Sequence, residues 1–328
     1  MSEVRAKKAL GQHFLVDLNI ARKICDALSG AGYAGAGAEA RTMAAGSADA
    51  GAEARTKATG TADADAETRR GVAASADARL AADTTAAGAP AAAEEERGGA
   101  VPCDVLEVGC GMGVLTQFLL RRGDITTYGA EIDPESVEYL HAHFPEFAPR
   151  LIEGDFLKMN LRERFPRGLK IIGNFPYNIS SQIFFKVLEH RDLVPECVGM
   201  IQKEVAVRIA EPPGSKEYGI LSVLLQAWYD IEYLFTVNET VFNPPPKVKS
   251  AVIRLRRNSV GRLGCDEALF VKVVKASFGQ RRKMIRNSLR TVFGDFGGAE
   301  HPFFTQRAEQ LSVADFVQLT NWVAANRK

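Results

Sequence analysis

From residue 104 to residue 256 the chain alternates short apolar segments with segments whose apolar residues recur at helical spacing. Short apolar segments bounded by turn residues are typical of strands, and the helical spacing is typical of amphipathic helices. Strands that alternate with helices pair in parallel, because each helix carries the chain back across the sheet. We therefore predict an α/β fold with a doubly wound, mostly parallel, Rossmann-like sheet. The expected strands are 105–108, 127–130, 150–153, 169–173, 196–201, 231–237 and 250–256, and the expected helices are 114–122, 134–143, 180–189, 203–210 and 219–228.

Beyond this sheet the apolar pattern is helical only, with helices expected at 266–278, 281–293, 304–309 and 312–325. Residues 243–328 contain 16 Lys or Arg and 6 Asp or Glu, a net charge of +10, while residues 101–242 have a net charge of −7. The whole chain has a formal net charge of only +1, so the basic end indicates a polyanionic partner held by one region. We expect a sheet domain over 101–256 and a small basic helical domain over 257–328.

Residues 31–100 consist almost wholly of Ala, Gly, Asp, Glu, Arg, Thr and Ser, and the hexapeptide Gly-Ala-Glu-Ala-Arg-Thr occurs at 37–42 and again at 51–56. A segment without Ile, Phe or Trp cannot bury a core, so we predict a low-complexity, disordered insertion. The preceding residues 1–30 should form an arm with an amphipathic helix at 18–29, packed on the domain that resumes after the insertion.

The sequence also indicates the cellular compartment of the protein. No apolar stretch approaches the roughly 18 residues of a membrane helix, and the basic start is not followed by the apolar region of a signal peptide. The five cysteines are scattered, without a Cys-x-x-Cys pair, which favours reduced thiols and no zinc site. We expect a cytoplasmic protein that neither enters a membrane nor holds a metal.

A glycine-rich motif, Glu107-Val108-Gly109-Cys110-Gly111-Met112-Gly113, directly follows the first expected strand and opens a helix. Gly109 and Gly111 would let a nucleoside-type cofactor approach the backbone at the carboxyl edge of the sheet. Val114 stands where a dinucleotide fingerprint has its third glycine, which disfavours pyrophosphate binding. Alone, this pattern is equally typical of a tight strand-to-helix turn.

Acidic residues follow the next two strands. Glu131 ends the second strand, where a carboxylate can accept hydrogens from both ribose hydroxyls of the cofactor. Asp155 ends the third strand, where it can accept the amino hydrogens of the cofactor adenine while Phe156 packs on the ring. Either acid alone would be a solvated strand end, but three consecutive strand ends with suitable groups favour a cofactor site.

The motif Asn174-Phe175-Pro176-Tyr177 comes directly after the fourth strand. An exocyclic adenine nitrogen is a poor nucleophile because its lone pair is delocalised, and two acceptors for its hydrogens would free that pair. The side-chain oxygen of Asn174 and the backbone carbonyl of Phe175 could be these acceptors. Pro176 would stiffen the turn, and Tyr177 would stack on an unstacked target base. The alternative is a proline-containing turn without chemistry.

With these residues together, the sequence resembles the ribosomal RNA adenine dimethyltransferase family, in particular its bacterial small-subunit branch. The resemblance covers residues 5–30 and 101–328. Besides the glycine motif, it rests on Lys8-Ala9-Leu10-Gly11-Gln12-His13-Phe14-Leu15, Glu131-Ile132-Asp133, Gly154-Asp155, Asn174-Phe175-Pro176-Tyr177-Asn178-Ile179-Ser180-Ser181, Pro244-Pro245-Pro246-Lys247-Val248-Lys249-Ser250-Ala251-Val252 and Phe278-Gly279-Gln280-Arg281-Arg282-Lys283.

The resemblance implies a methyltransferase domain over 101–256 that uses S-adenosyl-L-methionine, with cofactor contacts from His13 and Leu15 and from Asn174. It implies dimethylation of two adjacent adenosines near the 3′ end of 16S ribosomal RNA during small-subunit biogenesis. The partner would be the small ribosomal subunit or its precursor, bound by a monomer. Two features depart from the family: position 175 is Phe where Leu is usual, and the insertion separates the arm from its domain.

The basic helical domain is then expected to bind RNA. Arg282, Arg286 and Arg290 recur every four residues and should share one helix face towards the phosphates, with Ile285, Leu289 and Val292 as an apolar stripe towards the core. The predicted RNA-binding residues are Arg281, Arg282, Lys283, Arg286 and Arg290.

Three alternatives stay open at this point. They are the large-subunit RNA dimethyltransferase that confers macrolide resistance, a DNA adenine methyltransferase, and a non-catalytic ribosome-assembly factor on the same fold. The runs 244–252 and 278–283 favour the small-subunit enzyme, and the presence of Asn174 with both cofactor acids disfavours a factor without catalysis.

Overall fold

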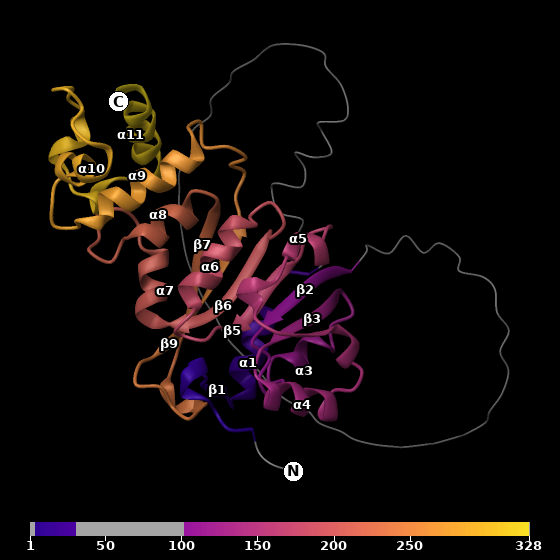
Figure 1. Cartoon of the computed structure of the whole chain (residues 1–328). Coiled ribbons are helices and arrows are strands. Elements are labelled where there is room, and N and C mark those ends of the chain that lie inside the picture. Colours follow the sequence, from indigo (N-terminus) through magenta and orange to yellow (C-terminus); the bar gives the residue numbers. More distant parts are fainter. Residues whose placement is uncertain (1–3, 31–101, 328) are drawn as a thin grey trace, which may run out of the picture. The chain divides into compact units, whose positions relative to one another are not determined.

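The computed structural model describes residues 4–30 and 102–327 (Figure 1). The predicted disordered insertion at 31–100 lies outside these residues. Among the described helices, none combines the length and apolar character that crossing a membrane requires.

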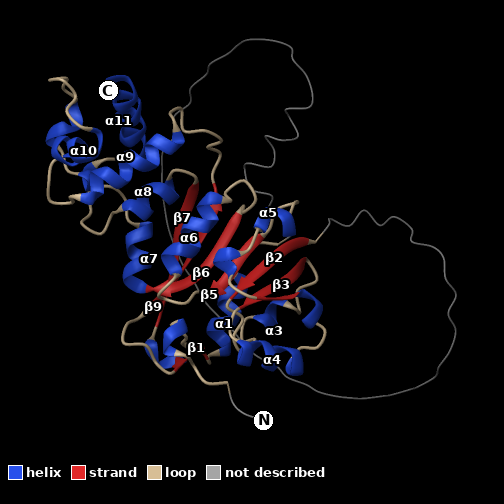
Figure 2. Cartoon of the chain, in the orientation of Figure 1, coloured by secondary structure: helices blue, strands red, loops and turns tan. Residues whose placement is uncertain are grey.

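The main sheet has seven strands in the order β4-β3-β2-β5-β6-β9-β7 (Figure 2). The first five pair in parallel, and β9 pairs antiparallel with both β6 and β7. This topology confirms the predicted doubly wound, mostly parallel sheet. The strands are β2 (Cys103–Val108), β3 (Ile125–Glu131), β4 (Leu151–Glu153), β5 (Lys170–Asn174), β6 (Glu196–Gln202), β7 (Tyr229–Val237) and β9 (Ser250–Arg257).

The helices that accompany the sheet include three that begin and end as predicted: α4 (Pro134–His143), α6 (Ser180–Glu189) and α7 (Lys203–Ala210). The others are α1 (Leu18–Asp26), α3 (Thr116–Leu119), α5 (Leu161–Arg164) and α8 (Ile220–Gln226). The helix expected at 114–122 is the short α3, because turns continue from the glycine motif to Leu115. Asp17 caps α1 by accepting hydrogen bonds from the backbone of Asn19 and Ile20.

The two faces of the sheet are buried against different parts of the chain. Leu106 and Ile171 belong to one hydrophobic cluster together with α6, whereas Val105 and Ile172 belong to a second cluster with α1 and α3. Neighbouring residues of a strand point to opposite faces, so this division follows from the strand geometry. The apolar face of α1 therefore holds the arm on the sheet across the gap at 31–101.

The end of the arm is also fixed by polar contacts at the amino edge of the sheet. Lys170 and Glu196 are fully buried there and lie 3.5 Å apart. Lys170 Nζ donates hydrogen bonds to the backbone oxygens of Ser29 and Gly30, at 3.1 and 2.8 Å. Cys103 begins β2 at the same edge, two positions before Val105, which is the register partner of Lys170. The described ends on both sides of residues 31–101 therefore lie at the amino edge.

A second, two-stranded sheet was not predicted. β1 (Phe14–Leu15) pairs antiparallel with β8 (Phe242–Asn243), so the arm contacts a segment more than two hundred residues further along the chain. A pair of two-residue strands has no periodicity that a sequence pattern can reveal.

The carboxyl-terminal part contains α9 (Glu267–Gly279), α10 (Ile285–Phe293) and α11 (Val313–Asn326). The predicted helix 281–293 begins four residues late, because residues 280–283 form a turn in which Lys283 N donates to Gln280 O. Arg282 therefore does not lie on the helix face predicted for it. Ile285 and Leu289 are buried as predicted, but Val292 is 59% exposed, so the prediction that it faces the core is wrong.

The helix expected at 304–309 is instead two short 3₁₀ helices, Pro302–Thr305 and Ala308–Gln310. The backbone of Gln306 and Arg307, between the two, is extended, and this interrupts the expected helix. α9 and α11 both contact α8, and one hydrophobic cluster includes residues of the sheet and of these helices. The boundary predicted at residue 257 remains a prediction.

Candidate active site

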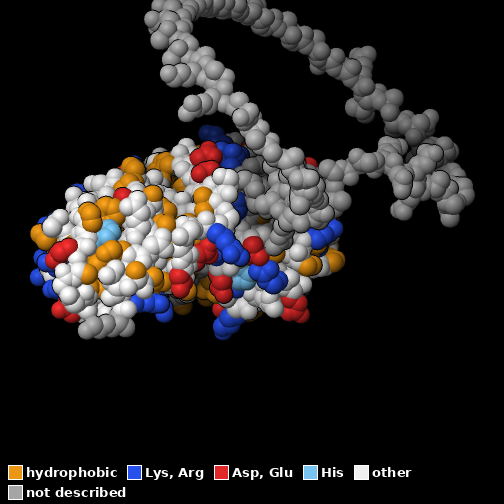
Figure 3. All heavy atoms as spheres, turned by 90° about the horizontal axis from the view of Figure 1, so that it is seen from above, with side chains coloured by type: hydrophobic (Ala, Val, Ile, Leu, Met, Phe, Trp, Pro, Cys, Tyr) orange, Lys and Arg blue, Asp and Glu red, His pale blue; other side chains and the backbone are white. Residues whose placement is uncertain are grey.

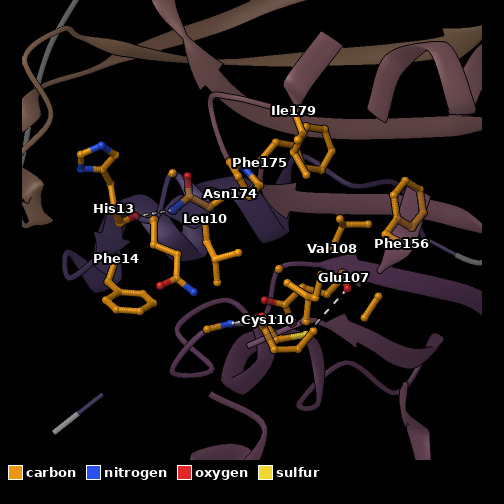
Figure 4. A pocket seen from close by; sticks show the side chains of 18 of the residues that line it. Leu10, His13, Phe14, Glu107, Val108, Cys110, Phe156, Asn174, Phe175 and Ile179 are labelled. Atoms are coloured by element: carbon orange, nitrogen blue, oxygen red, sulfur yellow. Dashed lines mark hydrogen bonds between the residues drawn. The ribbon is translucent and has the colours of Figure 1, made fainter. Parts of the chain in front are cut away.

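The carboxyl ends of β2, β3 and β5 border one pocket, which the arm covers with residues 10–15 (Figure 4). All the residues predicted for catalysis and for the cofactor line this pocket, although they come from segments far apart in the sequence. These lining residues are His13, Leu15, Gly109, Gly111, Glu131, Asp155, Phe156, Asn174, Phe175, Pro176 and Tyr177.

The glycine motif lets the arm approach closely. Gly111 has φ of +52°, and a Cβ on it would lie 3.1 Å from the ring of Phe14. An L side chain there would meet both backbone strain and a steric contact. Its N–H donates to Glu131 Oε2 at 2.8 Å, so the loop is fixed to the end of β3.

Glu131 is nearly fully buried and accepts two more backbone hydrogen bonds, from Ile132 and Asp133, both at 2.9 Å on Oε1. Burial raises the pKa of this carboxyl group. A carboxylate has about four acceptor sites and these bonds use three of them, so Oε2 can still accept a hydroxyl hydrogen of a ribose.

Asp155 Oδ1 accepts a hydrogen bond from Leu157 N at 2.9 Å. Its Oδ2 has no hydrogen-bond partner within the described ranges, so a ligand amino group could use it. The loop that bears Asp155 and Phe156 is held by Lys186, a residue that the sequence did not indicate. Lys186 Nζ donates to Leu157 O and Met159 O at 2.9 and 2.7 Å, and burial lowers the pKa of Lys186.

Asn174 is oriented by the arm. Its Nδ2 donates to the backbone oxygen of His13 at 2.9 Å (Figure 4). A carbonyl oxygen only accepts, so this bond assigns the amide nitrogen to the arm and directs Oδ1 elsewhere. Oδ1 has no partner among the described residues and is available as an acceptor. The arm thus positions the side chain for which sequence reasoning proposed the reaction chemistry.

Phe175 packs where two glycines provide space. Its ring is fully buried, and a Cβ on Gly199 would lie 2.5 Å from it, and one on Gly173 2.9 Å. Phe184 meets the same ring edge to face, with centroids 5.8 Å apart. The ring therefore packs in the core, which is a physical reason why Phe is accommodated at this position, where the family resemblance implied Leu.

Tyr177 is held at its hydroxyl and contacts the arm with its ring. The hydroxyl forms a hydrogen bond with Ser250, and the ring centroid lies 5.3 Å from that of His13. Burial raises the pKa of the Tyr177 phenol, which is therefore protonated at neutral pH. His13 Nδ1 in turn donates to Pro244 O at 2.9 Å. Two aromatic rings at the rim are thus fixed in place.

Two further groups were missed by sequence reasoning. Lys7 attaches the arm to α4 and the residue before it, because its Nζ pairs with the buried Asp133 and, at 3.0 Å, with Glu135. The hydrogen bond to Asp133 raises the pKa of Lys7. Glu107 lies buried beside the glycine motif and accepts a hydrogen bond from Thr116 Oγ1 at 2.6 Å. The sequence placed Glu107 in the first strand and at the start of the glycine motif but gave no sign of its burial, which depends on the tertiary packing.

The five residues predicted to bind RNA do not line this pocket. Arg281 donates to backbone oxygens of Lys216 and Tyr218, Arg286 pairs with Glu300, and Arg290 pairs with Asp295 at 3.1 Å. Arg282 and Lys283 are exposed and have no charged partner among the described residues. On the face shown in Figure 3, basic side chains lie among acidic and hydrophobic ones. RNA binding by these five residues remains a prediction.

In the described parts of the chain no cluster of three or more His, Cys, Asp or Glu side chains could hold a metal ion. The polar and aromatic groups that line the pocket include the side chains of Glu131, Asn174 and Tyr177. A doubly wound sheet whose strand ends carry a glycine loop, two acids and an Asn-Phe-Pro-Tyr turn defines the class of Rossmann-like methyltransferases.

Comparison with known proteins narrows this class. The family model described as ribosomal RNA adenine dimethylase matches residues 102–325. The chain belongs to the ribosomal RNA adenine dimethylase family.

A ribosomal RNA small subunit methyltransferase A from Parabacteroides distasonis is 61% identical over 218 residues, which cover 66% of this chain and 81% of that protein. The protein of the same name from Porphyromonas gingivalis is 47% identical over 324 residues, 98% of each chain. Among solved structures, a dimethyladenosine transferase from Plasmodium falciparum superimposes with a TM-score of 0.56 at 26% identity, covering 68% of this chain and 90% of that one.

Proposed function

We propose that this protein uses S-adenosyl-L-methionine to dimethylate the exocyclic amino groups of two adjacent adenosines near the 3′ end of 16S ribosomal RNA, during assembly of the small subunit. The proposal includes a monomeric enzyme in the cytoplasm. The relatives named as small subunit methyltransferases support the choice of substrate over the large subunit.

One observation carries the proposal. The unpartnered Asn174 Oδ1 lies in the same pocket as Glu131, Asp155 and Tyr177. These groups match the two ligands of the reaction: acids for a nucleoside cofactor, and an acceptor with an aromatic ring for a target base.

The pocket also suits the charge of the cofactor. Glu131 and Asp155 contribute carboxyl groups to its lining, and no Lys or Arg of the described residues lines it. S-Adenosyl-L-methionine supplies a methyl group activated by the positive charge of its sulfonium. A pocket lined with acids would stabilise that cation relative to its neutral product.

The residues of the chain then have separate tasks. Glu131 would bind the ribose hydroxyls and Asp155 the adenine amino group, while Phe156 packs on the adenine. Asn174 Oδ1 and the carbonyl of Phe175 would accept the two hydrogens of the target amine and release its lone pair for attack. Tyr177 would hold the base by stacking, so positioning supplies much of the rate acceleration.

The test is transfer of tritiated methyl groups to small ribosomal subunits that lack these modifications, followed by mapping of the methylated bases. We expect two adjacent dimethyladenosines near the 3′ end of the RNA. Large-subunit particles are the control substrate. Methylation of these particles instead, or no transfer to either, would reject the proposal.

A further inference from the structure

The segment 244–249, Pro244-Pro245-Pro246-Lys247-Val248-Lys249, has no task in the site as described above. It connects β8, which pairs with β1 of the arm, to the first residue of β9 (Figure 1). We call it the 244–249 loop. Its three prolines restrict the backbone, so the loop can present its side chains with little loss of entropy on binding.

Both ends of the loop are attached to aromatic rings of the pocket. At one end Pro244 O accepts the hydrogen bond of His13 Nδ1 at 2.9 Å. At the other end Ser250 binds the hydroxyl of Tyr177. These rings lie 5.3 Å apart and line the pocket. The 244–249 loop therefore borders the place where a target base would stack on Tyr177.

The charged side chains of this border are all cationic. Lys247 and Lys249 are both exposed, and the backbone N–H of Lys203 donates to Lys249 O at 2.9 Å, which brings a third exposed lysine alongside. Within the described residues none of the three ammonium groups has a carboxylate or hydrogen-bond partner, whereas Lys7, on the arm, is paired with two acids. The loop itself contains no acidic residue.

We propose that the 244–249 loop, together with Lys203, is a phosphate-binding lip that holds the RNA backbone next to the target adenosine. This inference rests on the proposed function and adds a binding site apart from the arginines of 281–290. A base that enters the pocket leaves its sugar and phosphates at the rim, because only the base is turned out of its stack. Unpaired lysines at that rim can replace the counterions of these phosphates.

Phosphate contacts position an RNA without reading its sequence. The lip should therefore contribute to the affinity for RNA and to the Michaelis constant of the RNA substrate, but not to cofactor binding. Lysine suits this task, since its ammonium group can approach a phosphate from many directions.

The experiment compares the double variant Lys247→Gln, Lys249→Gln with a matched control, Lys23→Gln, Lys272→Gln. The control removes two charges from exposed lysines on α1 and α9. Binding of a protein-free 3′-terminal fragment of small-subunit ribosomal RNA is measured over a series of salt concentrations. For the loop variant we expect an affinity about ten-fold lower and a log–log salt slope reduced by roughly 1.4 to 1.8.

Calorimetry with S-adenosylhomocysteine should give unchanged affinity in both variants, which would exclude misfolding of the pocket. An equal loss of RNA affinity in the control variant would show a general effect of net charge and would overturn the proposal. The proposal would also be overturned if the loop variant bound the RNA fragment normally but bound whole small subunits more weakly, because the partner of the loop would then be a ribosomal protein. If the proposed function were wrong, the result would be different: the unaltered protein would bind the RNA but would transfer no methyl groups to it in the tritium assay.

Discussion

The arm orients Asn174, because the hydrogen bond from Asn174 Nδ2 to His13 O leaves Oδ1 free to accept a hydrogen bond from the target amine. We expect Asn174→Ala to lower the single-turnover rate of methyl transfer by at least about a hundred-fold, as with loss of other preorganised polar groups. The affinity of this variant for S-adenosylhomocysteine, measured by calorimetry, should stay within a few-fold of that of the unaltered protein. Glu131→Ala is the converse control, since it should weaken cofactor binding. Normal turnover by the Asn174 variant would contradict the assignment.

Glu107 makes stability depend on pH. Burial raises its pKa to about 8 from a usual value of 4.5, and the nearby Glu131 acts in the same direction. Between these two values the folded protein holds a proton that the unfolded chain has released. The contribution of Glu107 to stability is therefore greatest below pH 4.5 and falls as the pH rises to about 8.

Glu107→Gln stays neutral and should keep the bond from Thr116, so its advantage over the unaltered protein should grow across this window. The difference in the free energy of unfolding should reach up to about 5 kcal/mol above pH 8. Urea denaturation without cofactor at pH 5.5, 7 and 8.5 measures it. A difference that does not change with pH would mean that Glu107 is ionised throughout.

At the scale of elements, the β5–β6 pair depends on glycines opposite each other, Gly173 and Gly199, against which the ring of Phe175 packs. Gly199→Ala should destabilise the protein by about 1 to 3 kcal/mol, because its Cβ would overlap this ring. Phe175→Leu should be mild alone and should relieve the overlap in the double variant. Urea denaturation of the four proteins tests this, and additive effects would refute the steric explanation.

The helices and strands also differ in how well the local sequence pattern predicts where they begin and end. α4, α6 and α7 have the predicted bounds because their amphipathic pattern is continuous from end to end. α10 begins late because a turn at 280–283 precedes it. Within that turn Arg281 donates to carbonyl oxygens of residues 216 and 218, and a tertiary contact of this kind leaves no mark on the local pattern. The same reason applies to β1 and β8, each of which is defined only by its partner.

At the scale of the whole molecule, residues 31–100 join two described ends that both lie at the amino edge of the sheet, whereas the pocket lies at the carboxyl edge. We expect replacement of residues 31–100 by a short Gly/Ser linker to leave a cooperatively folded enzyme with methyl transfer within about two-fold of normal. Thermal unfolding and the tritium assay measure this. Loss of a cooperative transition would show that these residues contribute to the core, against the prediction from their composition.

The sequence patterns alone determined the parallel sheet, the strand ends that form the site, and the residues predicted at those strand ends for cofactor and catalysis. These features follow from local patterns, because parallel strands bring their carboxyl ends to one edge wherever the helices between them lie. His13 and Leu15 were predicted only from the family resemblance. Only the tertiary structure decided that His13 O orients Asn174, that Ser250 holds Tyr177, that Glu107 is buried and that Val292 is exposed. Each of these depends on a contact between segments distant in the chain, and such contacts are selected by packing and by hydrogen-bond satisfaction across the whole fold.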